Sequence, residues 1–291
     1  MIPSNLIKRL KPSRSQLKII LAIIIYIVII AVLWNVKSLT WILWPFKIMT
    51  VTLHELSHAL MAICTGASVK KIIVNTNQGG KTVYAGGNNY LIVPAGYIGS
   101  TFFGSLLIFS GFNVHTSKLA TFIIMLCMGC TLFYSNGIFT FIFTTGVLIV
   151  VAMLLYTKKS KAIQYFVLFL GVMSGFYSLW DIAEDLIKRR IEGSDASSFA
   201  KLQGMGWLPP EAWGIVWLLF SMLTVILAIV LALLVFNTGN PNQNEEEEEE
   251  EENWELLPTS NPPVRFNSRN QNNNNFMNSN NNDDNFGFGV I

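Results

Sequence analysis

The sequence predicts an all-α polytopic membrane protein of about seven transmembrane helices, with a small cytosol-side β-hairpin and a disordered C-terminal tail. Of the 291 residues, 52% are hydrophobic and only 13% are charged, whereas soluble domains usually carry about 25% charged residues. The mean hydropathy is +0.45. The apolar residues gather in runs long enough to cross a bilayer, which takes about 20 residues.

The chain begins with a basic segment, residues 1–18, that precedes the first apolar run. Its positive residues are Lys8, Arg9, Lys11, Arg14 and Lys18. Cytoplasmic segments are enriched in Lys and Arg, so the N-terminus is expected to face the cytosol. The following run, 19–36, is long for a signal peptide and no small-residue cleavage pattern closes it, so we expect a retained anchor.

Seven apolar segments are expected to cross the membrane within one domain, residues 19–236. They are 19–36, 41–64, 90–112, 118–134, 137–156, 163–185 and 212–236. With alternating spans, the hairpin falls on the cytosolic side and the tail on the lumenal or exterior side. Lys158, Lys159 and Lys161 then fall opposite the N-terminus, against the positive-inside tendency.

Three segments are not expected to cross. Two β-rich runs, 69–74 and 81–84, flank an Asn- and Gly-rich turn and predict a hairpin. Residues 193–210 are polar and mixed, which indicates an interfacial helix and loop. The tail, 237–291, holds eight consecutive glutamates (245–252) and an asparagine-rich stretch, so it cannot bury enough apolar area to fold.

A metal-binding pattern lies inside the second expected span, in the order His54, Glu55, Leu56, Ser57, His58. Residues four apart share a helix face, so both imidazoles can bind one ion. Glu55 can then take a proton from a zinc-activated water and pass it to a leaving amine. A polar group in mid-span is costly and therefore indicates function; the alternative is a polar cluster that only holds helices together.

A catalytic zinc site needs a third protein ligand and an open position. The best donors lie near the end of the sixth span, where Asp181 is the first choice and Asp185 the second. The alternative is an acidic cap at the membrane boundary, which fits Asp185 better than Asp181.

These residues resemble the M50B-like branch of the site-2 protease clan of intramembrane zinc metallopeptidases. The matching elements cover about residues 45–220: His54–Leu60, Gly79–Thr82, Pro94–Ser100, Leu179–Ile187 and Ser194–Ala196. The resemblance implies that both histidines and an aspartate on a later helix bind Zn²⁺. The clan often has an Asp-Gly pair at this ligand, whereas this chain has Asp181 followed by Ile182.

Two further features have physical interpretations. Protease substrates bind extended, by pairing with a strand edge, so the hairpin could receive an unwound substrate. The candidate edge residues are Ile72, Ile73 and Val74, or Thr82, Val83 and Tyr84. A stripe of small residues (Gly96, Gly99, Ser100, Gly104, Ser105) predicts close packing against the zinc helix, or else a water path.

The sequence therefore predicts an intramembrane zinc metalloendopeptidase that cleaves membrane proteins within or near their spans. Its expected partners are transmembrane substrates and the lipid bilayer, and the net charge of +2 gives no indication of nucleic-acid binding. One alternative is a non-catalytic, metal-stabilised scaffold or sorting factor for transmembrane clients. Another is a transporter, which the confinement of polar groups to one site disfavours.

Overall fold

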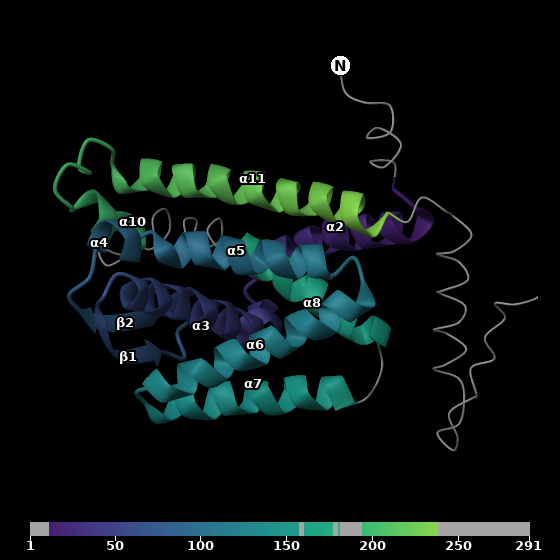
Figure 1. The fold of residues 1–291 in the computed structure, drawn as a ribbon, viewed down its shortest axis with the longest axis horizontal. Helices are drawn as coiled ribbons and strands as arrows, with labels where there is room; N and C mark the ends of the chain where they lie inside the picture. Colours follow the sequence, from purple (N-terminus) through teal and green to yellow (C-terminus); the bar gives the residue numbers. More distant parts are fainter. Residues whose placement is uncertain (1–11, 157–159, 177–179, 181–193, 238–291) are drawn as a thin grey trace, which may run out of the picture.

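The computed structural model describes residues 12–156, 160–176, 180 and 194–237. Asp181, Asp185 and nearly all of the expected tail lie outside these residues. The described part is an elongated bundle of helices with a two-stranded sheet at one end (Figure 1). This agrees with the mostly helical fold that the sequence predicts.

The elements follow the expected order, and each of the seven apolar segments contains a helix. They are α2 (Arg14–Asn35), α3 (Thr40–Cys64), β1 (Ser68–Val74), β2 (Gly80–Ala85), α4 (Asn89–Ile92), α5 (Ala95–Ser110), α6 (Val114–Tyr134), α7 (Ile138–Tyr156), α8 (Ser160–Gly175), α10 (Asp195–Ala200) and α11 (Pro210–Phe236).

Four of the described helices are long and apolar enough to cross a membrane: α2, α6, α7 and α11. Helix α3 has 25 residues, but its middle carries buried polar side chains. Helices α5 and α8 have 16 residues each, fewer than the roughly 20 needed for a straight crossing. Seven crossings therefore stay a prediction, whereas four helices have the length and composition to span.

The two ends of the bundle are formed by different elements. At one end, the start of α2 meets the end of α5 and the start of α8 around a pocket lined by Lys18, Phe112 and Lys161. The hairpin follows α3 at the opposite end (Figure 1). The start of α2 and the hairpin thus lie at opposite ends of the bundle, whereas the sequence predicts one side for both; the side of the membrane that each faces stays a prediction. Lys161, expected opposite the N-terminal basic residues, lies beside Lys18 instead.

Helix α5 lies against α3, α8 and α11, and its small residues explain this central position. A Cβ added at Gly99 would collide with Ser57 of α3, and one at Gly104 would collide with the backbone of Gly175 in α8. The predicted packing of the small-residue stripe against α3 thus holds for its first part. The second part instead brings α5 and α8 into backbone contact, as small residues allow.

The sheet consists of β1 and β2 in antiparallel pairing, with Ile72 opposite Thr82 and Val74 opposite Gly80. This confirms the predicted hairpin. The left-handed backbone in its turn falls on Gln78 (φ 67°) and not on Gly79 or Gly80. The backbone conformation of the turn therefore does not explain the glycine at position 80; its close approach to Glu55, described below, does.

Candidate metal centre

Helix α3 carries the two histidines on one face and buries them. His54 and His58 are 6% and 7% exposed, and Glu55 is 5% exposed. The rings meet edge to face, and their Nε2 atoms are 3.2 Å apart. This confirms the prediction that residues four apart on a helix bring both imidazoles to one point.

Groups outside α3 fix the orientation of both rings. The Nδ1 of His58 lies 2.7 Å from the carbonyl oxygen of Ile92; because a carbonyl only accepts, Nδ1 donates, and Nε2 is the nitrogen of this ring that could bind a metal ion. The Nδ1 of His54 lies 3.4 Å from the Ser100 hydroxyl. Metal-binding histidines commonly donate their second nitrogen to such a partner.

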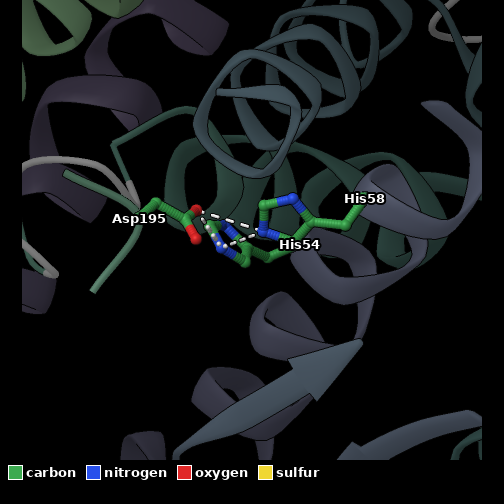
Figure 2. A group of neighbouring side chains, drawn as sticks. All are labelled: His54, His58 and Asp195. Atoms are coloured by element: carbon green, nitrogen blue, oxygen red, sulfur yellow. Dashed lines mark hydrogen bonds and ion pairs between the residues drawn. The ribbon is translucent and has the colours of Figure 1, made fainter. Parts of the chain in front are cut away.

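The third group at this point is Asp195, the first residue of α10. Its Oδ2 lies 3.0 Å from Nε2 of His54 and 3.1 Å from Nε2 of His58. Figure 2 shows the carboxylate pointing at both rings from a separate segment of the chain. His54, His58 and Asp195 thus form a group able to hold a metal ion among the described residues.

The charge state of Asp195 suits a cation. Burial alone would raise the pKa of this carboxyl, but His58 and His54 and the hydrogen bonds from their rings lower it below its ordinary value. The carboxylate is therefore ionised at neutral pH. Without a metal, the rings therefore donate protons toward Oδ2, and a metal ion could replace these protons at the point that Oδ2 and the two Nε2 atoms share.

The backbone of α5 closes over this point. A Cβ added at Gly96 would collide with ring atoms of both His54 and His58. Tyr97, 1% exposed, packs edge to face on the His54 ring at a centroid distance of 5.4 Å. Glycine at position 96 therefore makes the room in which the two rings meet.

Glu55 faces the hairpin. The Thr82 hydroxyl lies 2.7 Å from Oε2 of Glu55 and 2.8 Å from the Glu55 carbonyl oxygen. A Cβ added at Gly80 would collide with the Glu55 side chain, including Oε1. Strand β2 therefore passes directly over the carboxylate, and Gly80 permits this approach.

The two hairpin strands differ in what covers them. Ile72 and Val74 of β1 are 0% and 2% exposed. The outer edge of β1 bonds to Asn136, between α6 and α7, and to Thr140 of α7. Of the described residues, none pairs its backbone with the outer edge of β2. Val83 and Tyr84 are partly exposed there, and Tyr84 donates to Asn89.

The site contains His54, Glu55, His58 and Asp195. The sequence analysis predicted the first three as site residues and did not predict Asp195. Asp181 and Asp185, its choices for the third ligand, lie outside the described residues. Asp195 follows Ser194, whose side chain accepts from the Ser197 backbone, so the pair is typical of an ordinary helix start. The segment Ser194–Ala196 was part of the family resemblance, and that was the signal available.

Comparison with known proteins decides the family. Residues 23–228 match the family described as Peptidase M50B-like. The chain belongs to this family. The matched part contains His54, Glu55, His58 and Asp195, and it includes most of α2, which the resemblance seen in the sequence had left outside. No curated protein and no solved structure matches the chain.

Membership of a peptidase family indicates a protease. Within the matched residues, the structure supplies a group of two buried imidazoles and one half-buried carboxylate that could hold a metal ion. A second carboxylate, Glu55, adjoins the first histidine. This member of the family therefore has three side chains that could bind a metal ion, and the carboxylate of Glu55 lies next to them in the sequence.

Proposed function

We propose that the chain is a zinc metalloendopeptidase of membranes, which hydrolyses peptide bonds of other membrane proteins within or near their transmembrane segments. The observation that carries this proposal is the convergence of His54, His58 and Asp195, with Glu55 beside them, in a member of a peptidase family. Helices able to span a bilayer lie on both sides of this site in the sequence.

The donor set supports zinc. Two imidazole nitrogens and one carboxylate oxygen, with a fourth position open, are typical of catalytic zinc sites. Tetrahedral ligands about 2.0 Å from an ion lie about 3.3 Å from one another. The observed separations of 3.0, 3.1 and 3.2 Å are close to that value. A bound zinc ion would supply Lewis acidity toward the scissile carbonyl and toward water.

The residues of the chain would perform the remaining steps. Glu55 accepts a proton from the attacking water, whose oxygen bonds to the carbonyl carbon of the scissile peptide. Glu55 then delivers this proton to the amide nitrogen as the carbon–nitrogen bond breaks, so the products are a carboxylic acid and an amine. Burial of Glu55 and both histidines keeps bulk water from competing for these groups.

The hairpin supports a substrate-binding role for β2. A helical substrate has to unwind before its peptide bonds can react, and an unwound segment can pair with a strand edge. The outer edge of β1 is covered, and Ile72 and Val74 belong to the core. Strand β2, with Val83 and Tyr84 partly exposed, passes over Glu55 and is therefore the edge that we propose for substrate pairing.

The test compares the full chain with Glu55→Gln in proteoliposomes that contain a panel of single-span reporter proteins. We expect both proteins to retain zinc, and only the unchanged protein to cut within or near a reporter span. Identical cleavage patterns would overturn the proposal. If neither cuts and both bind the reporters equally, the non-catalytic scaffold or sorting factor becomes the better interpretation.

A further inference from the structure

The side chain of Thr82 has no role in zinc binding, yet it makes the closest polar contact with Glu55. Its hydroxyl lies 2.7 Å from carboxylate Oε2 and 2.8 Å from the main-chain oxygen of the same residue. The two residues come from different elements, β2 and α3. We infer that Thr82 is a positioning residue for Glu55, which orients the carboxylate for proton transfer; this inference rests on the proposed function.

The geometry explains how one hydroxyl can fix the whole side chain. Both acceptors belong to Glu55, so the contact ties the tip of the side chain to its own backbone. A glutamate in a helix otherwise has three rotatable bonds, and holding one rotamer costs conformational entropy. With Oε2 held by Thr82, Oε1 keeps its lone pairs for a proton, beside Gly80, where no side chain intervenes.

The hairpin is anchored well enough to serve as a support. The indole of Trp44, in the first turns of α3, donates to the carbonyl of Thr76 at 2.9 Å. The Asn136 amide donates to Ile72 at 3.0 Å, and the Val74 amide donates to Thr140 at 3.1 Å. The turn and β1 are held at these points, and β1 pairs with β2 through Ile72 opposite Thr82, so the hairpin supports Thr82 beside Glu55.

The test uses three substitutions in the full chain, purified with its zinc and assayed on a reporter that the unchanged protein cuts. Thr82→Val keeps the shape and removes the donor, whereas Thr82→Ser keeps the donor. Thr76→Val is the matched control, because Thr76 lies exposed in the same hairpin and contributes its carbonyl, not its side chain, to Trp44.

For Thr82→Val we expect kcat to fall about 10- to 100-fold, which is less than the roughly 10²- to 10⁴-fold that a whole acid–base group contributes, because Glu55 itself remains. KM and the zinc content should stay the same. Thr82→Ser should restore kcat to within about threefold of the unchanged protein, since the hydroxyl can make the same contact. Thr76→Val should behave like the unchanged protein.

Several outcomes would overturn the inference. They are an unchanged kcat in Thr82→Val, a loss of zinc together with activity, a change confined to KM, or an equal loss in Thr82→Ser. The last two would assign Thr82 to substrate pairing or to packing. Failure of the proposed function looks different, because Glu55→Gln would then match the unchanged protein whatever residue stands at position 82.

Discussion

At the scale of single residues, the site depends on atoms that approach one another closely. Two nitrogens and one oxygen lie 3.0–3.2 Å apart, and a glycine backbone covers them. Such a group is stable when a cation balances the carboxylate and accepts the lone pairs. Each contact in it can be removed separately, which gives two predictions.

The first prediction concerns the third metal ligand. Asp195→Ala should lose bound zinc, because it removes a carboxylate that touches both histidines. The loss of affinity should exceed the roughly 10- to 100-fold typical of an outer hydrogen-bonding partner. The measurement is zinc per protein by mass spectrometry after dialysis against a weak chelator.

The matched variants are Asp181→Ala and Asp185→Ala, which change the aspartates that the sequence favoured. Both should retain zinc. Loss of zinc in Asp181→Ala, with retention of zinc in Asp195→Ala, would show that Asp181 and not Asp195 is the third metal ligand.

The second prediction concerns the glycine over the site. Gly96→Ala should displace both imidazoles, because the new Cβ would overlap their ring atoms, and zinc occupancy should fall. Gly129→Ala in α6 is the control, since a Cβ there meets no atom within 4 Å. The control should keep its zinc, and its free energy of unfolding should rise by up to about 1 kcal/mol, because alanine has a higher helix propensity than glycine. Full zinc occupancy in Gly96→Ala would contradict the described approach of α5.

At the scale of elements, the position of Asp195 depends on how a helix of six residues is docked. Phe199 of α10 is 8% exposed and packs against Trp213 and Trp217 of α11, with ring centroids 4.8 and 5.4 Å apart. Trp217 in turn packs on Tyr97, which contacts His54. A chain of aromatic contacts therefore joins the docking of α10 to the His54 ring, whose Nε2 lies 3.0 Å from Oδ2 of Asp195.

This gives a prediction for a residue that touches no metal ligand. Phe199→Ala removes a buried aromatic side chain, a change that costs about 3–5 kcal/mol in a packed core. Part of this cost should appear as weaker zinc binding, because undocked α10 no longer holds Asp195 in place. The measurement is a competition titration with a chromophoric chelator.

Phe133→Ala is the control for that titration, since Phe133 is 87% exposed on α6. Its zinc affinity should equal that of the unchanged protein. Equal affinity in Phe199→Ala as well would mean that α10 holds its place without the aromatic contacts.

At the scale of the whole molecule, the bundle separates the metal site from the basic N-terminal end. Lys18 and Lys161 lie around a pocket at one end, and the hairpin lies at the other (Figure 1). If the bundle crosses a bilayer along its length, the two ends face different compartments. The positive-inside tendency then places the hairpin opposite the compartment of the N-terminus.

A labelling experiment tests this arrangement. In a chain without its three native cysteines, single cysteines at Ser15 and Asn77 should react with an impermeant maleimide from opposite sides of sealed vesicles. Both positions lie outside the packed core. Labelling of both from one side would contradict the orientation and favour the arrangement that alternating spans predict.

The sequence by itself determined the features that depend on local periodicity. A helix brings His54 and His58 together whatever surrounds it, long apolar runs form helices in a bilayer, and β-rich runs around a polar turn pair as a hairpin. Only the tertiary structure decided which aspartate joins the histidines, which strand edge is covered, and why Gly80, Thr82 and Gly96 stand where they do. These are contacts between segments far apart in the chain, and several aspartates and glycines fit the local pattern equally well. Which aspartate and which glycines lie at the site depends on tertiary packing, and the periodicity of the sequence carries no information about that packing.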